Sequence, residues 1–144
     1  MESAVTETIF DAFPKPPCAE LLGWRLIAID REKQQIRIGF TARPEFLNPA
    51  GYVQGGLLAA MLDDVMGPAA LVMSEGRLFT STLDMTVSFL APARLGLLIG
   101  EGTVIQLGKT IAYLQGELRD ESGTLIARAT STARMVATDR LAAG

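Results

Sequence analysis

The chain has no histidine and a single cysteine, Cys18, among its 144 residues. The absence of histidine excludes a Ser-His-Asp or Cys-His catalytic unit within this chain. It also argues against zinc, whose usual ligands are histidine nitrogen and cysteine sulfur, so no metal site is expected. One cysteine cannot form an internal disulfide. Acid–base chemistry must therefore come from carboxylates, lysine or tyrosine.

Basic runs and uninterrupted long apolar segments are missing as well. The net charge is −3 and the basic residues are scattered, so nucleic acid is not an expected partner. Asp63 and Asp64 interrupt the longest apolar stretch, so no membrane span is expected. Glu7 and Asp11 break any N-terminal apolar run of the kind that a signal sequence needs. These absences favour a cytoplasmic protein.

Hydrophobic residues make up 49% of the chain, and the length fits a single domain over residues 1–144. This apolar content is high for a monomer and leaves surface for contacts between subunits. We expect residues 1–20 to be a lead-in and residues 138–144 to be a loose tail.

The pattern of apolar residues predicts two strands, one long helix and four further strands. The helix is expected from residue 57 to about 74, because Leu58, Leu62, Val65, Ala69 and Val72 recur at helical spacing. Alternation and turn residues predict strands at 24–30, 35–42, 79–92, 97–108, 110–120 and 124–136. This order fits an α+β fold in which an antiparallel sheet wraps around one helix.

A second stripe of the helix carries small residues, among them Gly56, Ala59 and Gly67. One face of the helix can therefore pack on the sheet, while the small residues of the second stripe allow another group to approach the helix closely. Pro68 has no N–H, so the carbonyl of Asp64 should lose its helical partner and the helix should bend there.

The segment "NPAGYVQGGLLAAMLDD", residues 48–64, carries the residues of chemical interest. Gly55 and Gly56 stand where a loop becomes the helix. The first N–H groups of a helix have no internal partner and lie at the positive end of its dipole. Without side chains in the way, these amides can act as an oxyanion hole. The alternative is that the two glycines only permit a tight turn.

Asp63 follows Gly56 by seven residues, which returns it to the stripe of small residues. Burial would strip the water shell of this carboxylate and suit it to act as a nucleophile or base. Asp64 is expected to be a solvated polar position.

Seven residues of helix rise about 10 Å, so the glycine amides and Asp63 of one helix cannot touch the same small carbonyl group. If both act on one carbonyl, a second chain must supply one of them. Two antiparallel copies of the helix across a two-fold axis would create two such composite sites.

Three polar residues accompany the glycines and Asp63. Asn48 and Gln54 can hold a carbonyl or a water by hydrogen bonds, but neither can act as a base. Asn48 also fits an ordinary turn residue before Pro49. Thr82, in the strand after the helix, can orient a water or the Asp63 carboxylate, although threonine is common in strands.

The segment resembles the signature of hotdog-fold acyl-CoA thioesterases of the phenylacetyl-CoA and 4-hydroxybenzoyl-CoA thioesterase type. That pattern has Asn, a loop with Gly, His-Gly-Gly and an acid nine positions after the His; Asn48, Gly51, Gly55, Gly56 and Asp63 match it. Residues 81–96, "STLDMTVSFLAPARLG", and the last two strands are also similar to the family. The resemblance covers about residues 20–137.

The resemblance implies a hotdog fold and hydrolysis of a small or aromatic acyl-CoA. It assigns Asp63 as the catalytic carboxylate and the Gly55 amide as the donor to the thioester carbonyl. It places Asn48 beside the substrate or water and Thr82 beside Asp63. It also implies homodimers with composite sites, often paired into tetramers, and no cofactor apart from the coenzyme A of the substrate.

The chain departs from the family pattern at Gln54, which stands where the family has His. Gln54 can still donate a hydrogen bond but does not titrate near neutral pH. Because a thiolate leaves readily, a strong general acid is not required. Coenzyme A phosphates need cations, for which Arg94, Lys109 and Arg128 are the candidates, although each also fits a solvated surface charge.

Two alternatives to hydrolysis stay open at this point. A non-catalytic acyl-CoA-binding module would keep the fold, but it has no use for a buried carboxylate beside a thioester. A hydratase or dehydratase acting on acyl thioesters would need a His with an acid, and the chain has no His.

Overall fold

The computed structural model describes residues 8–141. Its helices are α1 (Pro17–Leu22) and α2 (Gly55–Met73), with short 3-10 turns η1 (Ile9–Ala12), η2 (Pro44–Phe46) and η3 (Thr138–Arg140). Its strands are β1 (Arg25–Asp30), β2 (Gln35–Ala42), β3 (Leu78–Phe89), β4 (Gly96–Leu107), β5 (Ile111–Asp120) and β6 (Leu125–Ala137). The predicted helix and all six predicted strands are confirmed, with small shifts at their ends.

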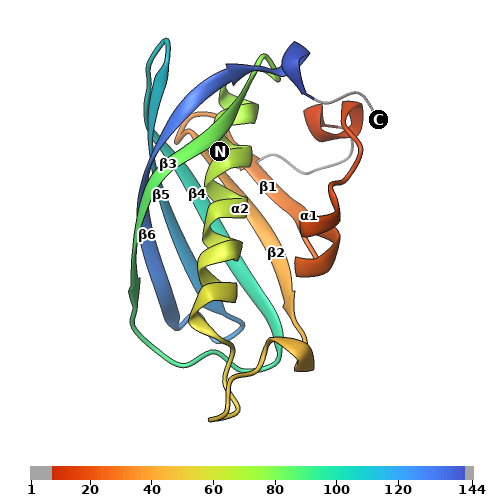
Figure 1. The fold of residues 1–144 in the computed structure, drawn as a ribbon, viewed down its shortest axis with the longest axis vertical. Helices are drawn as coiled ribbons and strands as arrows, with labels where there is room; N and C mark the ends of the chain where they lie inside the picture. The colour runs from red at the N-terminus through yellow and green to blue at the C-terminus, as the bar shows by residue number, and fades with distance from the viewer. Residues whose placement is uncertain (1–7, 142–144) are drawn as a thin grey trace.

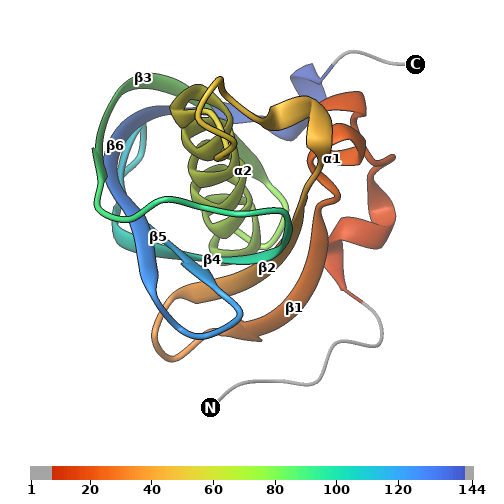
Figure 2. The same ribbon diagram turned by 90° about the horizontal axis from the view of Figure 1, so that it is seen from below.

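The strands form one antiparallel sheet in the order β1-β2-β4-β5-β6-β3. The sheet curls around α2, which runs through its concave side (Figures 1 and 2). Residues that alternate along each central strand point to the helix and are buried, as the two-residue period of a strand requires. The predicted α+β architecture with one central helix is therefore confirmed.

The apolar face of α2 forms the centre of the core. Leu58, Leu62, Val65, Ala69 and Val72, which the sequence placed on one face, are all buried. The helix approaches β4 closely, since a Cβ atom at Gly102 would collide with the carbonyl of Val65. By length and composition α2 could also cross a membrane, but core helices of globular domains pass the same test.

Strand β3 is an edge of the sheet and contains a β-bulge at Leu83. Thr82 pairs with Ala133 and Asp84 with Thr132, so Leu83 is the extra residue. A bulge shifts the alternation of side chains by one position. Residues on both sides of the bulge can therefore face α2, although their numbers differ in parity.

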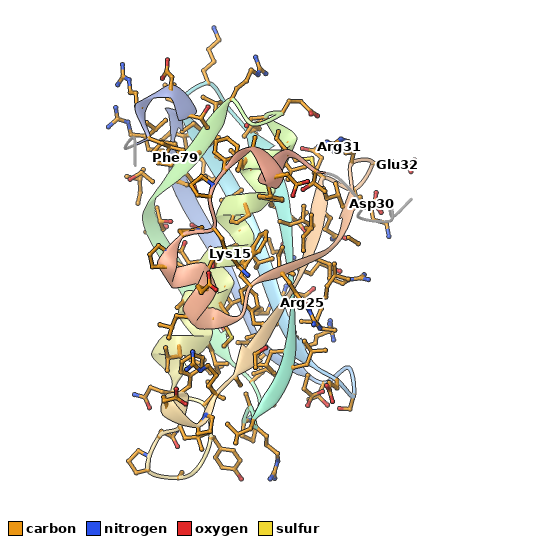
Figure 3. The ribbon with its side chains drawn as sticks, turned by 90° about the vertical axis from the view of Figure 1, so that its right-hand side faces the viewer. Lys15, Arg25, Asp30, Arg31, Glu32 and Phe79 are labelled. Carbon is orange, nitrogen blue, oxygen red and sulfur yellow. The ribbon has the colours of Figure 1, made fainter. Side chains whose placement is uncertain are left out.

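The N-terminal segment covers the side of α2 that the sheet leaves open, as the view in Figure 3 shows, with α1 in front of the helix. The indole N–H of Trp24 donates a 2.9 Å hydrogen bond to the carbonyl oxygen of Asp64. This is the carbonyl that Pro68, without an N–H, leaves free, and α2 continues unbroken through Pro68. Phe10 packs edge-on against the Trp24 ring.

Short helical turns lie near both ends of the described residues. Gly23 closes α1 in the left-handed conformation that glycine adopts readily. Residues 138–140, at the start of the predicted loose tail, form the turn η3, in which Thr138 donates hydrogen bonds to the carbonyls of Gly76 and Arg77. Residues 142–144 of that tail, and residues 1–7 of the lead-in, lie outside the described residues.

Candidate active site

The N-terminus of α2 presents two amides with no hydrogen-bond partner among residues 8–141. Gln54 is the N-cap in extended conformation, and its side chain makes no capping hydrogen bond. The helix therefore starts at Gly55, and the N–H groups of Gly55 and Gly56 have no carbonyl one turn earlier to bond. Gln54 and Gly56 are exposed and Gly55 is half-buried. These two N–H groups can donate hydrogen bonds to an oxygen atom of a ligand.

The loop before the helix is held by Asn48. Its Oδ1 accepts hydrogen bonds from the backbone N–H groups of Ala50 (2.9 Å) and Tyr52 (3.1 Å). The oxygen of the Asn48 side chain therefore shapes the loop. The role of Asn48 toward a substrate or water stays a prediction, and the amide nitrogen is the atom with which it would act.

A second loop, residues 90–95, lies against this one. The N–H of Val53 donates to the carbonyl of Ala93 at 2.9 Å. The guanidinium of Arg94 stands 5.6 Å from the ring centroid of Tyr52, which is within cation–π range. Arg94 is thereby placed at the same end of the molecule as the first turn of α2.

Asp63 and Thr82 meet between α2 and β3. The Thr82 hydroxyl donates a 2.8 Å hydrogen bond to Oδ1 of Asp63. Asp63 is half-buried and Thr82 is exposed. The sequence named both residues, and the structure brings them together. The second carboxylate oxygen of Asp63 is left to accept a proton or attack a carbon.

Phe89 is a neighbour of the first turn of α2 that the sequence alone did not single out. A Cβ atom added at Gly55 would lie 3.3 Å from Cζ of the Phe89 ring. The ring itself is 53% exposed. Met85 and Val87 of the same strand pack against the core. The helix terminus is thus flanked by an apolar wall, which the aromatic residue at the end of a strand could have signalled.

Asp64 is half-buried, so the prediction of a solvated position holds only in part. Its Oδ2 atom is inaccessible to solvent and has no hydrogen-bond partner among the described residues. Burial and the neighbouring charge of Asp63 raise the pKa of Asp64 to about 7. The two carboxyls therefore differ in their surroundings: one oxygen of Asp64 is closed off from solvent, whereas Asp63 faces the exposed seam between α2 and β3.

The two parts of the candidate site are separated along α2. Eight residues from Gly55 to Asp63 correspond to about 12 Å of helix rise. Both parts lie on the side of α2 that faces β3, beside Phe89 and Thr82 respectively. One chain therefore presents an amide site and a carboxylate site that are too far apart for a single small carbonyl group.

The three cations suggested for coenzyme A lie in different places. Arg94 is exposed near the start of α2, as described above. Lys109 lies in the turn between β4 and β5, at the end of the sheet where α2 finishes (Figure 1). Arg128 is exposed on β6 between the buried residues Ala127 and Ala129, so it points to the face of the sheet away from α2. Within one chain, only Arg94 joins the Gly55 end.

A depression of about 300 Å³ lies on that outer face of the sheet. None of the candidate site residues lines it; its lining is Arg37, Ile99, Glu101, Glu117, Arg119, Asp120, Glu121 and Gly123. Its position on the far side of the sheet separates it from the amides and the carboxylate of α2.

Comparison with known proteins agrees with this architecture. Residues 50–127 match the model of the Thioesterase superfamily. A phenylacetic acid degradation-related protein of Ralstonia eutropha is 38% identical, with 88% of this chain and 95% of that chain covered and a TM-score of 0.82. A Streptococcus mutans protein, solved with acetyl CoA, shares the fold at 18% identity, with 79% and 89% coverage and a TM-score of 0.70.

Human acyl-coenzyme A thioesterase 13 is 32% identical over 90 residues, which are 61% of this chain and 64% of the human protein. The resemblance to hotdog acyl-CoA thioesterases, and the prediction of a thioester hydrolase, are confirmed at the level of the family. The family match over the α2 signature, together with a sheet wrapped around that helix, shows that the chain belongs to the thioesterase superfamily.

Proposed function

We propose that this chain hydrolyses a small or aromatic acyl-CoA to the free acid and coenzyme A. The observation that carries the proposal is the hydrogen bond from Thr82 to Asp63, on the same side of α2 as the free Gly55 amide. A carboxylate fixed at one oxygen keeps its other oxygen in a defined direction. An amide donor at the helix start supplies the complementary group for a developing oxyanion.

Asp63 acts in this reaction as nucleophile or general base. As a base, it takes a proton from water while the water oxygen forms a bond to the thioester carbon. As a nucleophile, it forms that bond itself, and water then hydrolyses the mixed anhydride. In both routes the C–S bond breaks, the thiolate of coenzyme A leaves and then gains a proton. A good leaving group makes a histidine general acid unnecessary.

The groups around the thioester carbonyl have complementary roles. The Gly55 N–H, at the positive end of α2, stabilises the negative charge that develops on the carbonyl oxygen. Gly56 offers the next free amide. Gln54 and Asn48 donate through their side-chain amides to the substrate or to water. Phe89 provides apolar contact for the acyl group beside these donors.

The proposed site is shared between two chains. A second chain with antiparallel α2 would bring its Gly55 amide to the Asp63 carboxylate of the first, which the separation within one helix requires. Strand β3 supports this arrangement, since it is an unpaired edge with exposed Leu83 and Phe89. Native proteins seldom leave a long apolar edge uncovered. We expect a homodimer, and pairing of dimers into a tetramer.

The names of two relatives and the position of Arg94 support the proposed acyl-CoA substrate. The human relative is named an acyl-coenzyme A thioesterase and the Ralstonia relative a phenylacetic acid degradation-related protein. Arg94 lies near the helix start, where it can meet a phosphate of coenzyme A. Lys109 and Arg128 would contribute only from another subunit or another face. The reaction needs no metal or further cofactor, and we place it in the cytoplasm.

Release of coenzyme A from a panel of short, long and aromatic acyl-CoAs tests this function. Wild type and Asp63→Asn are compared, with Asp84→Asn, an exposed acid on β3, as the matched control. We expect Asp63→Asn to lose at least about 100-fold in kcat while folding and assembly persist. Asp84→Asn should keep wild-type activity.

Two results would contradict the proposal. Full activity in Asp63→Asn would remove this carboxylate from the mechanism. A wild type that binds acyl-CoA but releases no coenzyme A from any member of the panel would indicate a binding module, in which Gln54 replaces the histidine of an active enzyme.

A further inference from the structure

Asp64 is a carboxyl group that the proposed reaction does not yet use. It follows Asp63 directly on α2, so its side chain leaves the helix about 100° away from the Asp63–Thr82 pair. Its Oδ2 atom is buried without a hydrogen-bond partner among residues 8–141. The Trp24 indole bonds the backbone carbonyl of the same residue, which fixes this turn of the helix.

The N-terminal segment covers the side of α2 where the Trp24 indole reaches Asp64, and its charged residues Asp11, Lys15, Glu20 and Arg25 are all exposed. None of them forms a hydrogen bond with Oδ2 of Asp64. Strands β2, β4 and β5 pack against α2 with apolar side chains or glycine, such as Ile38, Gly100 and Leu114. The acids Glu101 and Glu117 alternate with these residues and face the other side of the sheet. On β6, the inward residues are apolar apart from Ser131.

The charge that acts on Asp64 directly is that of Asp63, its neighbour on α2. Asp84, the one charged residue of β3, is exposed and adjoins Met85, which packs toward the core. Asp64 forms no ion pair with any described residue. A buried carboxyl without a cation or a donor is favoured in its protonated form, and the charge of Asp63 strengthens that preference.

We propose that Asp64 is a positioning residue for the proposed hydrolysis: its buried carboxyl works as an uncharged acid, which leaves Asp63 as the single negative charge facing the thioester. The inference rests on the function proposed above. It assigns Asp64 no contact with the substrate. Asp64 acts through the electrostatic field at Asp63 and at the thioester carbonyl.

The rate of hydrolysis should depend on pH through Asp64. When Asp64 ionises, a second negative charge lies beside Asp63. That charge opposes the negative charge that develops on the carbonyl oxygen in the transition state. A like charge about 8 Å away in a partly screened site lowers the rate by about fivefold. Wild-type kcat should therefore fall as pH rises through neutrality.

The test is the pH profile of kcat between pH 5 and 9.5 for wild type, Asp64→Asn and the control Asp84→Asn. Asparagine has nearly the shape of a protonated aspartate and cannot ionise. We expect a fall of about fivefold centred near pH 7 in wild type and in Asp84→Asn. Asp64→Asn should lack that fall and keep one rate across the neutral range.

A second measurement follows the proton directly. Carboxyl carbon NMR of aspartate-labelled protein identifies Asp64 as the signal that is lost in Asp64→Asn. That signal should titrate near pH 7 in wild type. If Asp64→Asn fails to fold, Asp64→Ser replaces it in both measurements, because serine is smaller and also uncharged.

The outcomes separate this role from the proposed function. Active wild type with a neutral inflection that survives in Asp64→Asn overturns the role of Asp64 alone. An Asp64 signal that titrates near pH 4 does the same. A wild type that releases no coenzyme A overturns the proposed function, and the role of Asp64 in hydrolysis with it.

Discussion

The hydroxyl of Thr82 on β3 donates a 2.8 Å hydrogen bond to Oδ1 of Asp63 on α2. Removing the hydroxyl with Thr82→Val should lower kcat by about tenfold, because the carboxylate then loses its orienting donor. Thr82→Ser keeps the hydroxyl and should retain most of the activity. Steady-state rates of coenzyme A release measure both, and equal loss in the two variants would contradict this role.

Gly55 offers its backbone N–H at the first position of α2, where proline is tolerated. Gln54, with ψ of 136°, already has the conformation that a following proline requires. Gly55→Pro should therefore fold but lose about 10²–10³ in kcat, because the donor is gone. Gly55→Ala keeps the N–H and tests the crowding of Phe89 alone. Similar losses in both variants would argue against the amide as oxyanion donor.

Shared sites predict complementation between two inactive variants. Asp63→Asn and Gly55→Pro each damage both sites of a homodimer, but a mixed dimer keeps one site with both groups intact. Random mixing by co-expression should restore about a quarter of the wild-type activity. Size-exclusion chromatography confirms assembly. Absence of any recovery in well-formed mixed dimers would place the amide and the carboxylate of each site in one chain.

The bond between Trp24 and the Asp64 carbonyl should contribute to stability. Trp24→Phe leaves that carbonyl without a donor, at a cost of about 1–3 kcal/mol in the free energy of unfolding, apart from any loss of packing. In a Pro68→Ala background the new backbone N–H can bond the same carbonyl, so the cost should be smaller. Chemical denaturation of the four proteins measures the difference, and equal costs in both backgrounds would contradict the account.

Stability should depend on pH through Asp64. Its pKa is raised from 3.8 to about 7 in the folded chain, so the folded state binds the proton more tightly than the unfolded state. The free energy of unfolding therefore falls as pH rises from about 4 through 7, by an amount on the order of 2 kcal/mol after screening by solvent. Asp64→Asn should gain stability relative to wild type over this range. A constant difference between pH 4 and 8 would count against it.

The helices and strands could be predicted well because the spacing of apolar residues that marks them is a local property of the sequence. Alternation in the strands and the three- and four-residue spacing of Leu58, Leu62 and Val65 depend only on which face is buried. The spacing of Gly55 and Asp63 also indicated both parts of the site. The free carbonyl of Asp64 followed from Pro68 alone.

The remaining features depend on contacts between distant segments. Local pattern could not show that Trp24 supplies the donor to Asp64, since the two residues are 40 positions apart. It expected Asp64 to be solvated, whereas Asp64 is half-buried with one oxygen closed off from solvent. It also could not place Arg128 on the outer face or Lys109 at the far end, since both depend on strand register.

The bulge at Leu83 divides β3 into two halves, and the alternation of residues that face α2 shifts by one position between them. Before it, Thr80 and Thr82 face α2 with even numbers; after it, Met85, Val87 and Phe89 do so with odd numbers. Loss of one residue there would turn the apolar half away from the helix while the hydroxyl that holds Asp63 stayed in place. A single inserted position thus separates a polar half from an apolar half, and evolution can reshape the wall beside Gly55 without disturbing the carboxylate.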